Sequence, residues 1–209
     1  MMRKINKKYN QIGRSMVEML GVLAVAGILS IGGIAGYNRA SRTLRLNNLK
    51  DDLSHIIANV RTTFLTQVNY HNISAENMIK VGIIPDHMIG SDGKSIVNRL
   101  GGSVTLDSAK TKDDNEGAFI LIFNGIDSET CYSLVVEDWG NDMQTGFLGL
   151  AVSKTGEMTA QTTNLIDVDI ETTETTFKSA DLPMAFISQS HSACMCTERQ
   201  SCSIAWKFM

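Results

Sequence analysis

The segment that decides the fold of this chain is Met19–Tyr37, MLGVLAVAGILSIGGIAGY, nineteen residues without a charged side chain. A helix of this length rises about 28 Å, roughly the thickness of a bilayer's hydrocarbon core. A soluble helix normally keeps a polar face, whereas this segment is apolar or small on every side. It therefore predicts a membrane-spanning helix rather than a buried core helix. Its glycines predict close contact with neighbouring helices: Gly21, Gly27, Gly32, Gly33 and Gly36.

The residues before this span do not form an ordinary secretory signal, which has a shorter apolar core followed by a small-x-small cleavage site. A basic stretch from Arg3 to Lys8 leads to Gly13 and Arg14, and Glu18 stands at the edge of the apolar run. A carboxylate at this depth is unfavourable in lipid and suggests a function. The alternative is that Glu18 simply reaches back to the membrane interface.

The strings KKYNQIG (7–13) and RSMVE (14–18), followed by the apolar run, resemble the class III signal of type IV prepilins. The resemblance implies that a prepilin peptidase cuts between Gly13 and Arg14. It also implies that the new N-terminus is N-methylated and that Glu18, fifth in the mature chain, acts in assembly. The family usually has Phe, Met or another apolar residue where this chain has Arg14.

A second helical pattern follows the span, because apolar residues recur every three or four positions. The apolar stripe consists of Leu46, Leu49, Leu53, Ile56, Val60, Phe64 and Val68. Polar residues, Asp52 among them, occupy the other faces, and no proline interrupts residues 14–70. We therefore expect one helix over 14–70, apolar all round in its first half and amphipathic in its second.

The rest of the chain predicts one short helix and an antiparallel sheet. Ser74 is placed to cap a helix that runs to Lys80, and Pro85 starts a loop. Strands are expected where apolar residues alternate or run together: SIVNRLGGSVTLDSA (95–109), EGAFILIFNGI (116–126), SETCYSLVVEDW (128–139), GFLGLAVSKTGEM (146–158) and SIAWKFM (203–209). The acidic, Thr-rich tract 159–178 is expected to be an exposed loop with at most one edge strand.

Three segments of this body and the Cys-rich C-terminus resemble type IVb pilins, particularly the thin-pilus group: KVGIIPDHMI (80–89), NRLGGSVTL (98–106) and FILIFNGIDSETCYSLV (119–135). The resemblance implies an α+β pilin fold, in which a long N-terminal helix packs on an antiparallel β-sheet head. It divides the chain into a leader (1–13), a transmembrane or filament-core helix (14–45) and a head (46–209) that includes the amphipathic half of the helix.

Four cysteines in a chain with an export signal predict disulfides, since exported proteins fold in an oxidising compartment. Cys131 stands alone on a predicted strand, so its partner must come from the cluster of Cys194, Cys196 and Cys202. Four cysteines allow three pairings. The resulting staple resembles the one that bounds the C-terminal region of pilins. We expect Cys131 to pair with Cys196, which leaves Cys194 for Cys202.

A zinc site is the competing interpretation of this cluster, because His191 extends it to H-x2-C-x-C-x5-C. The Cys-x-Cys spacing is tighter than the gap that zinc-binding motifs normally use, and export argues against free thiolates. We therefore expect disulfides, with no metal and no cofactor.

Charge is divided unequally along the 209 residues. The first fifty hold nine Lys/Arg and a single acid, whereas the remainder hold ten Lys/Arg and twenty-one acids. An acidic body disfavours nucleic-acid binding, which calls for a basic surface. The four histidines are scattered in sequence, and no Ser/His/Asp or paired-carboxylate pattern indicates catalysis. We therefore expect a protein that is not an enzyme.

These features together predict a structural subunit that polymerises into a type IV pilus, with its N-terminal helices in the filament core. The resemblance implies four partners: further copies of the chain, the prepilin peptidase, the inner-membrane assembly machinery and, before assembly, membrane lipid. It places the precursor in the bacterial inner membrane and the assembled subunit at the cell surface. Two alternatives stay open: a type II secretion pseudopilin and an uncleaved single-span envelope protein.

Overall fold

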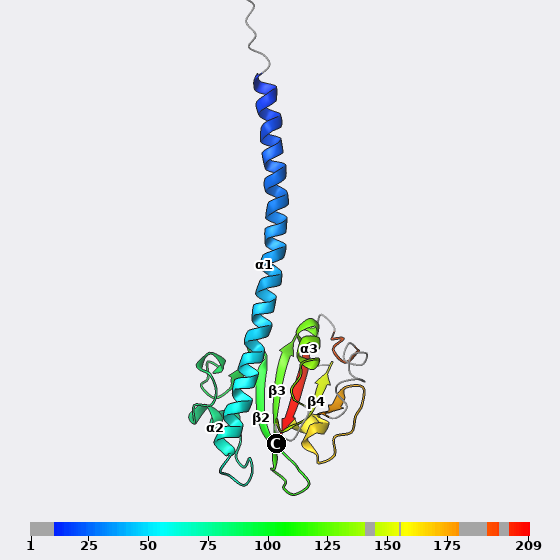
Figure 1. Ribbon diagram of the computed structural model, residues 1–209. Coiled ribbons are helices and arrows are strands. Elements are labelled where there is room, and N and C mark those ends of the chain that lie inside the picture. The colour runs from blue at the N-terminus through cyan, green and yellow to red at the C-terminus, as the bar shows by residue number, and fades with distance from the viewer. Residues whose placement is uncertain (1–10, 141–144, 155, 180–191, 197–200) are drawn as a thin grey trace, which may run out of the picture. The chain divides into compact units, whose positions relative to one another are not determined.

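The computed structural model describes residues 11–140, 145–154, 156–179, 192–196 and 201–209. The chain divides into two compact units, Met1–Arg45 and Leu46–Met209, and helix α1 (Gln11–Phe64) contributes to both (Figure 1). The described residues of the first unit, 11–45, all belong to α1. The second unit, which we call the head, contains all of the β-strands.

The amphipathic half of α1 supplies one layer of the head. Leu49, Leu53, Ile56 and Val60 are buried, as the apolar stripe predicts. In Figure 1 this part of α1, in cyan, lies between α2 (Ala75–Lys80) and the sheet. The expected short helix is therefore also present, and Ser74 caps it by accepting a hydrogen bond from the Asn77 N–H.

The long helix ends at Phe64, six residues before the expected end. Tyr70 explains this, because its ring lies 5.1 Å from that of Phe64 and 5.0 Å from that of Phe119 on the sheet. The Tyr70 N–H also donates to the Glu116 carbonyl at 2.9 Å. The chain therefore turns back under the helix, which leaves Val68, expected on the apolar stripe, 96% exposed.

The head contains a six-stranded antiparallel sheet with the order β1-β2-β3-β6-β4-β5. The strands are β1 (Ile96–Val97), β2 (Ser103–Ala109), β3 (Ala118–Ile126), β4 (Phe147–Ser153), β5 (Thr176–Lys178) and β6 (Cys202–Phe208). The expected C-terminal strand is thus present, and it lies in the interior of the sheet between β3 and β4. The last residues of the chain therefore complete the sheet.

Alternating side chains of the sheet enter two separate cores. Phe119, Leu121 and Phe123 of β3 face the core that α1 covers, whereas Ile120 and Ile122 face a second core on the other side. Both groups are fully buried. The near-continuous apolar run of β3 follows from this, because a strand covered on both faces has no side exposed to water.

The segment expected as a third strand, 128–139, is instead mostly helix α3 (Ser128–Val135). Asp127 caps this helix, since its side chain accepts hydrogen bonds from the Glu129 and Thr130 N–H groups. Cys131, Leu134 and Val135 are buried, and their spacing of three and four residues is that of one helix face. The strand prediction was wrong because the capping residue and the helical period were overlooked.

The Thr-rich tract is packed more closely than the sequence suggests. Ala160, Leu165 and Ile170 are buried in the second core, between the exposed acidic residues of the tract. Two 3-10 turns shape it, η2 (Ala160–Thr162) and η3 (Asn164–Ile166); a third, η1 (Asp86–Met88), follows Pro85. The expected edge strand is β5. The exposed-loop prediction thus fails for the apolar residues, which cover the sheet face.

Candidate functional site

The first candidate site is the apolar face of α1 in the N-terminal unit. Between Met16 and Tyr37 every large apolar side chain is 58% to 73% exposed. A β-carbon added at Gly32 or Gly36 would meet no atom within 4 Å, so the backbone here is open to close approach. The helix is long and apolar enough to cross a membrane, and its most apolar eighteen-residue window has a mean hydropathy of 2.1.

The residues expected to act in processing and assembly lie at the start of this helix. Gly13 and Arg14 belong to its first turns, and the Glu18 side chain is exposed one turn further along. Glu18 is the single acid of the first fifty residues. Its position at the boundary of the apolar segment agrees with the assembly role that the resemblance implies, and that role stays a prediction.

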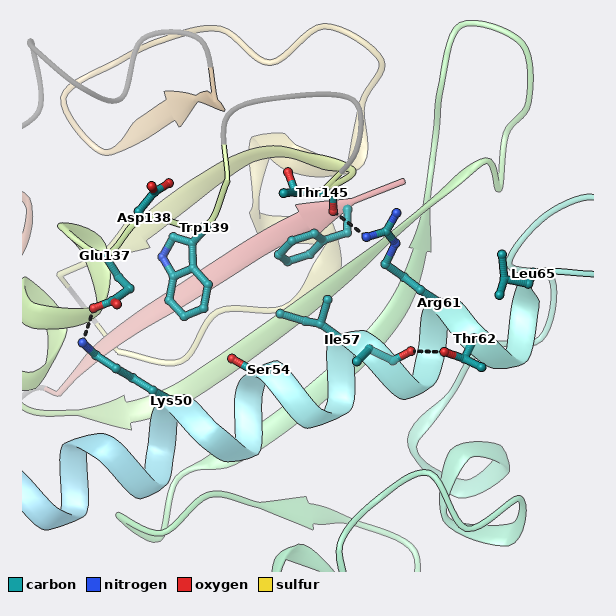
Figure 2. Close-up of a pocket in the computed structure, with 12 residues that line it drawn as sticks. Lys50, Ser54, Ile57, Arg61, Thr62, Leu65, Glu137, Asp138, Trp139 and Thr145 are labelled. Atoms are coloured by element: carbon teal, nitrogen blue, oxygen red, sulfur yellow. Dashed lines mark hydrogen bonds and ion pairs between the residues drawn. The ribbon is translucent and has the colours of Figure 1, made fainter.

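A groove in the head is the second candidate. It encloses about 650 Å³ between α1 and the segment that follows α3, and Figure 2 shows its walls. We call it the head groove; it is lined by Lys50, Ser54, Ile57, Ala58, Arg61, Thr62, Leu65, Glu137, Asp138, Trp139, Thr145 and Phe208.

Polar contacts join the two walls of the head groove at its ends. Lys50 on α1 forms an ion pair with Glu137, and Arg61 Nη1 donates to the Thr145 carbonyl at 2.7 Å (Figure 2). Trp139 is held in place because its Nε1–H donates to the Leu134 carbonyl at 2.8 Å. The groove is therefore an apolar hollow with charged ends, the kind of geometry that ligand and partner sites have.

A buried carboxylate, which the sequence prediction placed on a polar face, ties α1 to two loops of the head. Asp52 is only 5% exposed and accepts hydrogen bonds from Arg99 Nε at 2.6 Å and Nη2 at 3.1 Å. His87 Nε2 lies 3.0 Å from the same carboxylate. This acid holds the pKa of the Arg99 guanidinium above its usual value. The sequence contains an indication that Asp52 is buried, because it stands three residues after Leu49 and therefore on the apolar stripe.

All four cysteines form disulfides, but the expected pairing was wrong. Cys131 pairs with Cys194, at a Cα–Cα distance of 5.7 Å, and Cys196 pairs with Cys202, at 5.5 Å. Cys194 is buried beside α3, which carries Cys131, whereas Cys202 begins β6 opposite Ile126 and lies beside Cys196. In the chain-entropy account, a loop of this size, 63 residues, stabilises the fold by about 4 kcal/mol.

The competing zinc interpretation loses its three cysteine ligands, because Cys194, Cys196 and Cys202 are all in disulfides. His191, the fourth candidate ligand, lies outside the described residues. Across the part of the chain that the structure describes, no group of three His, Cys, Asp or Glu side chains is placed to hold a metal ion.

A buried lysine, which the sequence analysis did not single out, anchors the Thr-rich tract. Lys207 on β6 is 1% exposed, and its Nζ donates to the Asp167 carbonyl at 2.6 Å. Burial lowers the pKa of Lys207 to about 8, against the opposing effect of the Asp167 charge. The lysine therefore connects the central strand of the sheet to the segment that covers the second core.

Comparison with known proteins agrees with this geometry. Residues 38–197 match the family model described as Bundlin. Two relatives carry the description "Major structural subunit of bundle-forming pilus", from Escherichia coli O127:H6 (strain E2348/69 / EPEC) and Escherichia coli O111:H-. They are 26% and 25% identical to this chain, over 73% and 75% of its length and 76% and 78% of theirs.

The fold has a counterpart among solved structures. TcpA, a type IV pilin from Vibrio cholerae El Tor biotype, matches with a TM-score of 0.58 at 14% identity, over 79% of this chain and 99% of that one. At this identity the likeness shows the fold alone, a long N-terminal helix with an antiparallel sheet. The family match covers most of the chain and the fold is that of a type IV pilin, so the chain belongs to the Bundlin family.

Proposed function

We propose that this chain is the structural subunit of a pilus and that it polymerises through its N-terminal helix. The observation that carries the proposal is the exposed apolar surface of α1 from Met16 to Tyr37. Twelve large apolar side chains left 58% to 73% exposed would cost about 10 to 25 kcal/mol per subunit in water. Such a segment requires lipid or other helices around it.

The apolar half of α1 is surrounded first by lipid and later by other helices. The precursor holds the helix in the bacterial inner membrane, where lipid covers the apolar side chains. On assembly the helices leave the bilayer and pack against one another in the filament core, with the glycines permitting close approach. The acidic heads then face outward at the cell surface. The relatives described as major structural subunits of a bundle-forming pilus support the filament stage of this proposal.

Removal of residues 1–13 by a prepilin peptidase precedes assembly in this proposal. Cleavage after Gly13 creates a free α-amino group on Arg14, and the leader's basic residues leave with the peptide. Glu18 then neutralises the amino group of a neighbouring subunit. A charge-assisted contact of this kind becomes stronger in a low dielectric, so it can set the stagger between subunits in an apolar filament core.

The remaining partners follow from the same proposal. An inner-membrane assembly machinery extracts the subunits and adds them to the filament. The role is structural, and nothing in the geometry of the head groove calls for a catalytic group. The groove's charged ends and apolar floor suit contacts between subunits.

The deciding experiment joins two measurements on one preparation. The chain is expressed with the assembly machinery, shed filaments are imaged by electron microscopy, and their subunit is sequenced from its N-terminus. Filaments composed of subunits that begin at Arg14 are expected. A periplasmic protein without surface filaments would favour the secretion pseudopilin, and a subunit that begins at Met1 would establish the uncleaved envelope protein.

A further inference from the structure

The spacing of the four cysteines does not decide how they pair. The observed disulfides span 63 and 6 residues. Exchanging the partners of Cys194 and Cys196 would give spans of 65 and 8 residues by residue number. Because the probability of loop closure falls as the 3/2 power of loop length, these changes alter the pairing ratio by only about 1.6-fold. A tertiary contact must supply the selectivity.

Ser128, the first residue of α3, makes such a contact with Cys196. Its hydroxyl donates to the Cys196 carbonyl at 3.1 Å and accepts from the Cys196 N–H at 3.2 Å. One side chain thus binds both backbone groups of a single cysteine. This holds the Cys-x-Cys segment in one register against α3.

In this register Cys194 lies next to Cys131, its disulfide partner. Three residues along α3 from Ser128 stands Cys131, and two residues back from Cys196 stands Cys194, so the two segments run antiparallel. Cys131 and Cys194 meet at a Cα–Cα distance of 5.7 Å, within the usual range for a disulfide. A slip of two residues would bring Cys196 to Cys131 and would break both hydrogen bonds of Ser128.

The sheet positions the second disulfide, between Cys196 and Cys202. Cys202 lies opposite Ile126 at the end of β3, two residues before Ser128. Cys196, held by Ser128, is therefore presented to Cys202, and their Cα atoms are 5.5 Å apart. We propose that Ser128 is the residue that determines disulfide pairing in this protein, by fixing the register of the Cys-x-Cys segment against α3 and β6.

The chemistry is ordinary thiol–disulfide exchange. Each protein disulfide forms as two cysteine thiols lose two electrons and two protons, and a molecule of oxidised glutathione takes them up as two reduced glutathione molecules. A mispaired disulfide is corrected when a thiolate attacks one of its sulfurs and expels the other as a thiolate. Under reversible conditions the populations therefore report the relative free energies of the pairings.

The test uses the full chain in detergent, reduced and denatured, then reoxidised in a glutathione redox buffer. Cyanogen bromide cleaves after methionine in acid, where thiol exchange is suppressed. Met195 separates Cys194 from Cys196, so the cysteines fall on fragments 89–143, 185–195 and 196–209. The observed pairing joins 89–143 to 185–195 and leaves 196–209 separate, whereas both other pairings join all three fragments.

The wild-type chain is expected to give the two-fragment product with 196–209 separate. Loss of two hydrogen bonds in Ser128→Ala is expected to raise the share of the three-fragment product by about ten-fold. Ser133→Ala is the matched control, because Ser133 lies on the same helix and bonds only locally, to the Glu129 carbonyl. Unchanged pairing in Ser128→Ala would overturn the proposal.

Three further variants separate hydrogen bonding from simple misfolding. Ser128→Thr keeps the hydroxyl and is expected to pair as wild type; mispairing equal to that of the Ala variant would overturn the proposal. If Ser128→Ala does not refold, two-cysteine chains decide. With Ser128 present, the Cys196→Ser/Cys202→Ser chain should oxidise about ten-fold faster than the Cys194→Ser/Cys202→Ser chain, and equal rates would contradict a role for register.

Discussion

Asp52 on α1 accepts both N–H groups on one side of the Arg99 guanidinium, with Oδ2 2.6 Å from Nε and Oδ1 3.1 Å from Nη2. His87 Nε2 is close to both partners, 3.0 Å from Asp52 Oδ1 and 2.9 Å from Arg99 Nη2. The three residues come from α1, from η1 and from the turn between β1 and β2. This cluster therefore fastens the loops of the head to the helix through one buried carboxylate.

Replacing Arg99 with Met is expected to lower the free energy of unfolding of the head by about 2 to 4 kcal/mol. The substitution leaves the Asp52 carboxylate buried without its main partner, which costs more than losing an exposed ion pair. Urea unfolding followed by tryptophan fluorescence measures the change, since Trp206 is fully buried in the head.

The double variant Asp52→Leu/Arg99→Met is expected to be more stable than Arg99→Met alone, because it removes the buried charge together with its partner. Asp51→Asn, on an exposed neighbouring position of α1, is the control and should change little. Equal destabilisation by Arg99→Met and Asp51→Asn would contradict a special role for the buried carboxylate.

Stability of the head is expected to rise with pH between about 7.5 and 9.5 because of Lys207. Its pKa is lowered from 10.5 to about 8 in the folded head, so the unfolded chain binds more protons throughout this interval. Folding is therefore favoured as pH rises, by about 2 kcal/mol over these two pH units. The urea midpoint at several pH values measures the trend.

Lys207→Met should remove this rise, because the variant has no ammonium to desolvate. Lys110→Gln is the matched control: Lys110 is half exposed and lies 3.5 Å from the Asp167 carboxylate in the same region. In Lys110→Gln the stability of the head should still rise with pH. A wild-type midpoint that does not change with pH would show that Lys207 keeps its ordinary pKa in the folded head.

Glu18→Ala is expected to reduce filament yield at least about ten-fold while leaving the head folded. In the proposal the carboxylate neutralises the α-amino group of a neighbouring subunit, and charge-assisted hydrogen bonds of this kind are worth about 1.5 to 3 kcal/mol. Quantitative electron microscopy of shed filaments measures the yield. Glu18→Gln isolates the charge, and normal yield with unchanged subunit spacing would refute the assembly role.

Gly13→Val is expected to leave the leader attached. A peptidase that cuts after Gly13 must accommodate the residue on the leader side of the bond, and a branched side chain there prevents it from fitting. Intact-mass measurement should give a product heavier than the processed subunit by residues 1–13. Ile12→Val changes the neighbouring position and serves as the control. A variant whose mass shows removal of 1–13 would place the cut elsewhere.

Short repeats that continue over many residues correctly predicted the long helix. The apolar span and the stripe from Leu49 to Phe64 predicted α1, because burial along a helix repeats every three to four residues over many turns. The apolar runs at 116–126 and 203–209 predicted strands, and the structure has β3 and β6 there. Their place in the interior of the sheet is known only from the structure. The predictions failed where a short segment decided its structure through one residue, as Asp127 does when it caps α3.

The interior of the Thr-rich tract and the environment of Asp52 depended on distant parts of the chain. Leu165 and Ile170 stand in a tract of mostly polar and acidic residues, and they are buried because the outer face of the sheet needs a cover. Asp52 is buried because Arg99, forty-seven residues away, reaches it. The apolar residues of the tract follow no periodic pattern. Asp52 does stand three residues after Leu49 on the apolar stripe, but nothing near it in the sequence identifies Arg99 as its partner.

The sequence by itself determined that this chain carries a long apolar helix followed by an amphipathic one, an antiparallel sheet and four cysteines available for disulfides. These properties are local, since each depends on residue types at short and regular spacing. Only the tertiary structure decided which cysteines pair, because loop lengths of 63 and 65 residues are almost equal in entropy. The antiparallel register of Cys194 and Cys196 against α3, held by Ser128, makes that choice.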